Sequence, residues 1–443
     1  MLIDKNFKPI YLFFRQFEAD VRSAQNLPFN VAVERNCGYT YVYRSFVFAD
    51  QNMAETSFKY AERLVKTLIW LVGGYKIYID APSWLFERLK AEFSEHGKRA
   101  FDAATMKRVY EHEFEIAGVD GGRFPAEKKQ LIACRTDLTG AKIGFDAGGS
   151  DRKIAAVLDG KVLFSAETVW HPKLNDDPDY HYALIKSDML KAASYLPRID
   201  KIGVSSAGIY VDNKIMLASL FIKVPDDLFE NKVKNMYIDI ARELNAPVTV
   251  ANDGDVAALA GAMEAGEGNI LGIAMGTSEA AGFIDADNNL WGWLNELAFV
   301  PVDLNESAAV DEWSGDIGTG VKYLSQDAVI KLAEAVGLTL DGDSPAQKLK
   351  SAQEFVREGN PKAVAVFTDI GEYLAYALLY YRVFYGFKNV LLMGRVASGR
   401  GGEIILDTAK AVLRQFEDGR DIVLSLPDEA KRRVGQAVAA AAL

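Results

Sequence analysis

Residues 143–164 read IGFDAGGSDRKIAAVLDGKVLF, and this stretch limits the fold of the chain more than any other. A short apolar strand ends at Asp146, and the turn that follows holds three small residues: Gly148, Gly149 and Ser150. Without a Cβ, the turn amides can approach an anion closely, and the serine hydroxyl adds a donor. Residues 154–158 predict the return strand, and Asp159-Gly160 predicts a tight turn into a third strand. The pattern predicts a phosphate-binding hairpin, although glycines that serve only the turn would fit as well.

A second polar centre follows the strand expected over residues 247–251. Asn252, Asp253 and Asp255 stand between this strand and the small-residue helix expected over residues 256–264. A carboxylate beside the positive end of a helix stays ionised. Asp253 could therefore take a proton from a hydroxyl while its oxygen attacks a phosphoryl group. The alternative is a helix N-cap, a role that Asp255 is better placed to fill.

Further small-residue turns follow other expected strands. A strand, a turn with glycine and hydroxyl groups, and a second strand recur at residues 269–284, where the turn holds Gly276, Thr277 and Ser278. Two such turns could bind a nucleoside triphosphate from two sides. The strand expected over residues 201–206 ends in small residues that include Ser206, which would let a ligand or another segment approach. A glycine-rich turn at residues 394–402 follows the strand expected over residues 390–393.

The N-terminal third has an α/β pattern of its own. Expected strands around an Asn36–Gly38 turn precede a helix over residues 58–72, a strand over residues 75–79 and a second helix over residues 84–93. A similar helix, strand and helix recur at residues 373–413. We hypothesise that the N-terminal third is a degenerate copy of a downstream unit, with a turn too bulky for phosphate; chance similarity between α/β segments is the alternative.

Composition excludes several classes of protein. The net charge of −11 argues against broad nucleic-acid binding. Cys37 and Cys134 are the two cysteines of the sequence, and neither has the neighbours of a zinc site or a disulfide framework. The first residues do not have the pattern of a signal peptide, and the apolar run near residues 68–72 is too short to span a bilayer. We expect a cytoplasmic protein that binds neither nucleic acid nor membrane; homodimerisation is left open.

In their order, these landmarks resemble the actin-like ATPase fold and, within it, the ROK group of sugar kinases and sugar-responsive regulators. The resemblance covers about residues 142–443. It implies an α/β fold of duplicated lobes with an extra N-terminal α/β region. The expected parts are an N-terminal region, a first lobe that includes the C-terminal helix, and a second lobe: residues 1–138, residues 139–252 with 430–443, and residues 253–429.

The resemblance also implies roles for single residues. Asp253 would be the general base, Asn252, Glu296 and Ser206 would contact a sugar-like substrate, and Asp146 would hold Mg²⁺ through water. The residues expected to bind ATP are those of the two phosphate motifs and the adenosine motif: Gly148, Gly149, Ser150, Gly276, Thr277, Ser278 and Gly394.

Four departures from the family pattern affect these roles. Phe299 stands where the family has a histidine, and Val321 aligns with a second sugar-binding glutamate. The zinc-binding cysteines are replaced by SGDIGTGVKYLS at residues 314–325, so no zinc site is expected. Glu279 interrupts the second phosphate turn, where a negative charge costs affinity unless it faces away or meets the metal.

We therefore expect an ATP- and Mg²⁺-dependent kinase that phosphorylates a hydroxyl of a sugar-like small molecule bound between two lobes. A sugar- or nucleotide-binding sensor or scaffold that has lost catalysis is the main alternative, because the sugar-contact positions are altered. An ATP hydrolase that couples closure to a partner protein is a third reading.

Overall fold

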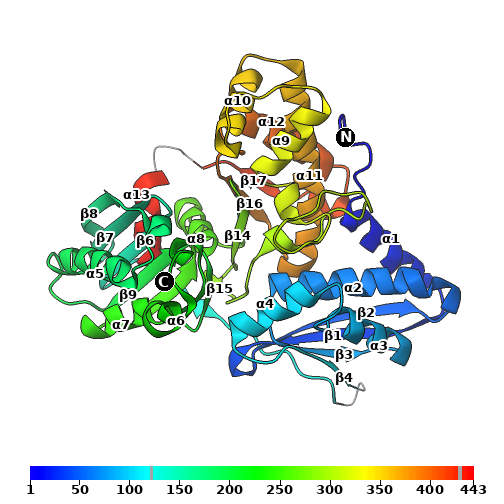
Figure 1. Cartoon of the computed structure of the whole chain (residues 1–443), viewed down its shortest axis with the longest axis horizontal. Coiled ribbons are helices and arrows are strands. Elements are labelled where there is room, and N and C mark those ends of the chain that lie inside the picture. The colour runs from blue at the N-terminus through cyan, green and yellow to red at the C-terminus, as the bar shows by residue number, and fades with distance from the viewer. Residues whose placement is uncertain (120–122, 428–431) are drawn as a thin grey trace. The chain divides into compact units, whose positions relative to one another are not determined.

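The computed structural model describes residues 1–119, 123–427 and 432–443 (Figure 1). The chain forms two compact units, each built from separate stretches of sequence. The first unit contains Met1–Gln130, Ile273–Ala280 and Gly292–Leu426. The second unit contains Leu131–Gly272, Ala281–Trp291 and Pro427–Leu443. The division into residues 1–138, 139–252 and 253–429 stays a proposal.

The second unit is organised by a five-stranded sheet with the order β12-β9-β6-β7-β8. Its strands are β6 (Ala141–Ala147), β7 (Asp151–Leu158), β8 (Lys161–Val169), β9 (Lys201–Ser206) and β12 (Val248–Asn252). The first three strands pair antiparallel, as the glycine and Asp-Gly turns predict. β9 pairs parallel with β6, and β12 pairs parallel with β9. The carboxyl ends of three neighbouring strands therefore meet at one edge of the sheet.

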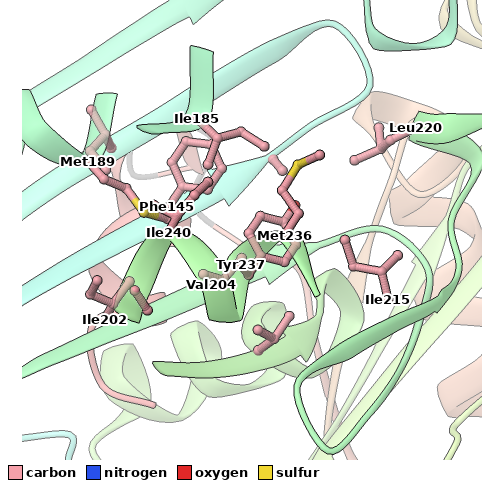
Figure 2. Close-up of a cluster of buried hydrophobic side chains, with 14 of the residues drawn as sticks. Phe145, Ile185, Met189, Ile202, Val204, Ile215, Leu220, Met236, Tyr237 and Ile240 are labelled. Carbon is pink, nitrogen blue, oxygen red and sulfur yellow. The ribbon is translucent and has the colours of Figure 1, made fainter. Parts of the chain in front are cut away.

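One face of this sheet carries an apolar core beneath α5 (Pro178–Ala193) and α7 (Met236–Glu243). Figure 2 shows Phe145 and Val204 of the sheet among Ile185 and Met189 of α5 and Tyr237 of α7. Shorter elements lie between β9 and α7: β10 (Ile209–Val211), β11 (Lys214–Leu217), α6 (Asp226–Leu228) and η6 (Phe229–Val233). The spacing of apolar residues over residues 229–244 predicts one helix, but only its second half is regular α-helix.

The other face of the sheet packs against the C-terminal helix α13 (Arg432–Ala440). A Cβ on Gly144 would lie 1.8 Å from the Ala437 carbonyl oxygen, and one on Gly203 would lie 1.7 Å from that of Ala440. Only glycine fits at these two positions, because the helix backbone touches the strands. The alanine-rich sequence of residues 430–443 predicts a helix that can pack closely against a sheet, and the described part of this segment does so.

The second unit also contains α8 (Asp253–Ala265), most of β14 (Glu279–Ile284), β15 (Asn289–Leu290) and β5 (Ile132–Ala133); the three strands are neighbours in their sheet in this order. A Cβ on Gly254 of α8 would lie 2.4 Å from the Ala281 carbonyl oxygen of β14. The first turn of α8 is therefore held directly against a strand.

The N-terminal part of the first unit has a sheet of its own, with the order β2-β1-β3-β4. Its strands are β1 (Asn26–Glu34), β2 (Thr40–Phe48), β3 (Lys76–Asp80) and β4 (Glu115–Gly118). Its helices are α1 (Ile10–Ser23), α2 (Ala54–Leu71), α3 (Ser83–Glu92) and α4 (Ala100–Tyr110). β3 pairs antiparallel with β1, whereas β9 pairs parallel with the corresponding strand β6. This difference argues against a degenerate copy, because the N-terminal hairpin leads into α2 without a third strand.

The remainder of the first unit combines a sheet with four helices. β17 (Val423–Ser425), β16 (Asn389–Met393) and β13 (Ile270–Met275) are neighbours in the sheet. The helices are α9 (Gln326–Ala335), α10 (Pro345–Arg357), α11 (Pro361–Tyr385) and α12 (Gly399–Leu413). By length and composition α11 could cross a membrane, but 72% of its most apolar window is buried inside the protein. Among the described residues it is the one helix that meets this test, and it packs as a core helix.

Candidate active site

Four predicted site residues lie at the carboxyl ends of β6, β9 and β12. Asp146 is level with Ser205, and Ser206 is level with Asn252, in the parallel register of these strands. Asp253 follows Asn252 directly as the first residue of α8. Since strand ends of a parallel sheet expose polar groups to ligands, this edge of the second unit is the candidate active site.

Asp146 is almost fully buried, with 4% of its surface exposed. The Ser205 hydroxyl donates to Asp146 Oδ1 at 2.7 Å, and Lys153 Nζ lies 3.4 Å from Oδ2. Burial raises the pKa of Asp146 above its ordinary value, while Lys153 and Ser205 favour the ionised form. Sequence patterns identified Asp146 alone, because the pairing of β6 with β9 is what brings Ser205 to it.

The start of α8 is capped by Asn252. Its Oδ1 accepts from the Gly254 amide at 2.7 Å, and its Nδ2 donates to the Gly208 carbonyl at 2.7 Å. The expectation that Asp255 is the cap is wrong: it lies inside the first helical turn, and its Oδ1 accepts from the Phe283 amide at 3.3 Å. Asn252 keeps one amide hydrogen and part of its carbonyl oxygen for a substrate hydroxyl.

Because Asn252 is the N-cap, Asp253 does not cap α8, which was the alternative to its role as a base. Burial and the nearby charge of Asp146 raise the pKa of Asp253 to about 6, while the Gly254 amide opposes the shift. Its main-chain carbonyl accepts from Gln436 Nε2 of α13 at 3.2 Å. A carboxylate with this pKa is ionised at neutral pH and is a stronger base than an ordinary aspartate.

The first phosphate turn is fixed by Trp170. The Trp170 indole donates to the Gly148 carbonyl at 2.7 Å, and its amide donates to the Ser150 carbonyl at 3.1 Å. The Gly148 amide donates to the Asp151 carbonyl at 2.9 Å, which closes the turn. Gly149 and Ser150 are exposed. The carbonyls of the turn are thus tied to Trp170, while its tip faces outward.

A basic side chain lies beside this tip. Lys173 Nζ is 4.0 Å from the point where a Cβ on Gly149 would lie. Lys173 belongs to the short 3₁₀ turn Pro172–Leu174 and is exposed. No sequence motif identifies this lysine. It follows the carboxyl end of β8, and only the pairing of β8 with β7 brings it to the turn.

Ser206, which was expected to contact the sugar, is buried in this structure. Its side chain is fully buried, and the Tyr237 hydroxyl donates to it at 3.2 Å. Neighbouring residues of a strand point to opposite faces, so Ser206 faces the core under α7 while Ser205 faces Asp146. The role of Ser206 as a substrate ligand stays a prediction.

In the first unit, the second phosphate turn lies beside the adenosine motif. A Cβ on Gly394 would lie 2.3 Å from the Met275 carbonyl oxygen, and the Val396 amide donates to that oxygen at 3.0 Å. Gly276 accepts from the Gln326 amide at 2.9 Å. The remaining residues of the turn are exposed: Thr277 and Ser278. Two motifs that are distant in sequence are thus brought together by β13 and β16.

Glu279 points into the interior rather than toward the turn. It is 3% exposed, and the Tyr381 hydroxyl donates to its Oε1 at 3.4 Å. Its Oε2 has no hydrogen-bond partner among the described residues, and it would lie 2.2 Å from a Cβ on Gly320. Burial raises the pKa of Glu279 to about 8, and the charge of Glu296 adds to the shift. The carboxyl is neutral at pH 7, so it places no fixed charge beside a phosphate.

Glu296 is held in place by the end of α2. The carbonyl oxygens of Trp70, Leu71 and Val72 accept from the amides of residues 294–296 at 2.9–3.2 Å. The last carbonyls of a helix have no partner within the helix, and here a segment of the candidate site supplies the donors. The N-terminal region therefore fixes the backbone of the expected sugar ligand.

Comparisons with known proteins concern the fold. No family model and no curated protein matches the chain. A ROK family glucokinase from Streptomyces griseus, solved with glucose and AMPPNP, is 19% identical, with a TM-score of 0.50 over 68% of this chain and 98% of that one. The ROK hexokinase from Thermus thermophilus is 16% identical, with a TM-score of 0.54 over 68% and 97% of the two chains.

A ROK family transcriptional regulator, a homologue of the E. coli MLC protein, is also similar. It is 18% identical, with a TM-score of 0.55 over 69% of this chain and 78% of that one. These solved structures share one architecture. The chain has the actin-like ATPase fold of the ROK proteins. The expected fold class is thereby confirmed, and about a third of the chain lies outside the ROK-like match.

The segment that lacks the cysteines of ROK proteins is held by ion pairs. Asp316 contacts Arg99 Nη1 at 2.8 Å, Lys66 Nζ at 3.0 Å and Arg63 Nη1 at 3.1 Å. Burial alone would raise the pKa of Asp316, but Arg63 and Lys66 outweigh it and hold the pKa below its ordinary value. Helices α2 and α4 of the N-terminal region thus anchor this segment through buried charges. No sequence motif identifies these three cations.

Proposed function

We propose that this protein is an ATP- and Mg²⁺-dependent phosphotransferase that acts on a hydroxyl of a sugar or sugar-like small molecule. The observation that carries the proposal is the pair of carboxylates, Asp146 and Asp253, at the carboxyl ends of β6 and β12, the two strands that flank β9. The sugar kinases with the same fold support the class of reaction.

Asp253 takes the proton of the attacking hydroxyl. Its pKa, raised to about 6, still lies below neutral pH, so Asp253 is mostly ionised there and is a better proton acceptor than an ordinary aspartate. The capping bonds of Asn252 and the contact with Gln436 hold the first turn of α8 in place. Proton transfer then needs no rearrangement of the helix. Asn252 and Glu296 are proposed to orient the hydroxyl-bearing substrate.

The residues around Asp146 fit a magnesium ion that keeps most of its water ligands. Mg²⁺ prefers oxygen donors and is commonly bound by one or two carboxylates together with phosphates. Asp146 and Asp253 form a region of negative charge, since the charge of Asp146 raises the pKa of Asp253. When bound, the ion would neutralise charge on the transferring phosphoryl group. Asp146 would hold its water ligands, oriented by Ser205.

The residues of the glycine turns fit a polyphosphate. A Cβ on Gly148 would lie 2.8 Å from the Asp151 carbonyl oxygen, so a larger residue would distort the turn. We propose that the residues of the two turns bind the phosphates of ATP and that Gly394 borders the adenosine. These residues are Gly148, Gly149 and Ser150 of the second unit and Gly276, Thr277 and Ser278 of the first.

The test is a coupled assay for ADP release with MgATP and a panel of sugars, comparing the native chain with Asp253→Asn. Loss of the general base should lower kcat by about 100-fold or more while ATP binding is kept. An unchanged rate of sugar phosphorylation in Asp253→Asn would refute this role of Asp253.

A sensor that binds sugar or nucleotide without transfer is the second candidate. Two observations favour it: Ser206 is buried against Tyr237, and both polar ends of the Asn252 amide are engaged. Calorimetric binding of a sugar together with no ADP release in the presence of that sugar and MgATP would support the sensor.

A further inference from the structure

The ring of Phe299 lies in an aromatic cluster built from two parts of the first unit. It stacks on Trp70 with ring centroids 4.2 Å apart, and the Phe101 ring is 6.0 Å from it. Trp70 belongs to α2 and Phe101 to α4. Trp70 is buried, whereas Phe101 and Phe299 are partly exposed. The Phe101 and Phe299 rings, from different segments of the chain, are therefore neighbours that are both partly exposed to solvent. The buried Trp70 ring packs against both.

This cluster is rigidly held. The Trp70 indole donates to Asp102 Oδ1 at 2.7 Å, and Asp102 is paired with Lys66 Nζ at 3.0 Å. Lys66 in turn contacts Asp316, so the rings connect to the buried ion pairs of the same unit. A buried charge network with satisfied partners leaves few alternative arrangements for the rings it supports.

The cluster also adjoins Glu296. Phe299 ends the 3₁₀ turn that Glu296 begins, and the Phe299 amide donates to the Glu296 carbonyl at 3.2 Å. Glu296 is the N-cap of this turn, three residues before Phe299. The main chain of Glu296 is bonded to the Trp70 carbonyl at 3.0 Å. Glu296 and Phe299 are thus carried by one short segment that is bonded to the end of α2.

We propose that Phe101 and Phe299, backed by Trp70, form a specificity surface that binds an apolar or aromatic substituent of the acceptor next to the hydroxyls held by Glu296. This inference rests on the proposed function, since it concerns the acceptor of that reaction. A carboxylate beside aromatic rings suits a ligand with hydroxyl groups on one side and an apolar group on the other. The acceptor class is therefore a glycoside with an aromatic or apolar aglycone rather than a free hexose. Trp70 acts as a positioning residue.

The experiment uses the full chain and two glycosides that differ in the aglycone, phenyl β-D-glucopyranoside and methyl β-D-glucopyranoside. Isothermal titration calorimetry should give about tenfold tighter binding of the phenyl glycoside, the factor expected for one aromatic contact. In Phe101→Ala this preference should fall to about threefold or less, with the affinity for the methyl glycoside unchanged. Phe101 is chosen because it makes none of the main-chain bonds to residues 294–296.

Phe46→Ala is the matched control, because Phe46 is 42% exposed on β2 of the same N-terminal region. It should leave both affinities unchanged. Equal affinity of the native chain for the two glycosides, binding of neither, or an equal loss of preference in Phe46→Ala would overturn the inference.

MgATP binding, measured separately by the same method, distinguishes the two proposals. If ATP binds and some other sugar is phosphorylated while the two glycosides are not distinguished, the inference fails and the proposed function stands. If the phenyl glycoside is preferred but no sugar, glycosides included, is phosphorylated, the proposed function fails and the specificity surface stands.

Discussion

The Ser205 hydroxyl donates to Asp146 Oδ1 at 2.7 Å, and the two residues stand opposite each other across β9 and β6. The bond orients a buried carboxylate whose other oxygen lies 3.4 Å from Lys153 Nζ. The orientation of Asp146 is therefore set by the sheet itself.

Ser205→Ala should impair catalysis through Asp146. Without the hydroxyl, the carboxylate loses its fixed orientation, and we expect kcat to fall by about tenfold, the effect of one lost hydrogen bond to a charged group. Steady-state kinetics at varied Mg²⁺ measure this. Ser45→Ala is the matched control, because the Ser45 hydroxyl contacts the Tyr60 hydroxyl at 2.8 Å in the N-terminal region. An equal loss of kcat in both variants would contradict the role of Ser205.

The rate should depend on pH through Asp253. Because the pKa of Asp253 is about 6, kcat/KM should fall as the pH drops below about 6, where the base becomes protonated. Asp146→Asn removes the negative charge that raises this pKa, so the residual activity of that variant should show its acidic limb at lower pH. A pH profile of kcat/KM from about pH 5 to about pH 8 measures both effects, and an acidic limb that stays in place in Asp146→Asn would argue against the coupling.

Glu279 should make stability depend on pH. Its carboxyl ionises near 4.5 in the unfolded chain and near 8 in the folded one. Between these two pH values the folded chain keeps the Glu279 proton and the unfolded chain has lost it. The free energy of unfolding therefore falls as the pH rises through this range. The fall should be on the order of 3 kcal/mol between about pH 5 and about pH 8, and it should be absent in Glu279→Gln. Chemical denaturation of both chains across this range is the measurement; identical pH dependence would show that Glu279 is ionised when folded.

Asp316→Ala should destabilise the first unit strongly. It leaves three buried cations without a shared partner, so we expect a loss of about 3–5 kcal/mol in the free energy of unfolding. Asp421→Ala is the control, since its pair with Arg382 is more exposed and is expected to contribute under about 1 kcal/mol. The folded pKa of Asp316 is lowered, so its stabilisation is present above the unfolded pKa and is lost below about pH 4. Urea denaturation separates the two variants.

Lys173→Ala should weaken binding of a polyphosphate. Its ammonium group lies beside Gly149, so we expect the KM for ATP to rise by about threefold to tenfold with little change in AMP binding. Lys161→Ala is the control, because Lys161 is exposed at the β7–β8 turn, at the other end of β7. Equal effects on ATP and AMP would mean that Lys173 acts on the fold rather than on phosphate.

Local patterns in the sequence predicted much of the second unit. Asp159 and Gly160 both have positive φ, which is why Asp-Gly marks the β7–β8 turn so clearly. The position of Asp253 between strand and helix also follows from local signals. The partners of these residues do not, because Ser205 reaches Asp146 only through the register of two strands that are more than fifty residues apart in sequence.

The first unit was harder to predict. Helix α1, IYLFFRQFEADVRS, was not predicted, since its aromatic residues have only moderate helix propensity and its buried positions are set by tertiary packing. The start of α11 was placed at residue 373 rather than at Pro361, although Asn360 and Pro361 form an N-cap and first helical position. The contacts of α2 with residues 294–296 join segments more than 200 residues apart, which no local pattern encodes.

The direction of β3 decides what the N-terminal sheet can do. β1 and β3 run antiparallel, so their carboxyl ends lie at opposite edges of the sheet. The loops that follow Glu34 and Asp80 therefore leave the sheet at opposite edges. Polar groups carried by those two loops cannot converge on one small molecule. Point substitutions in these two loops would therefore not build a pocket that they share.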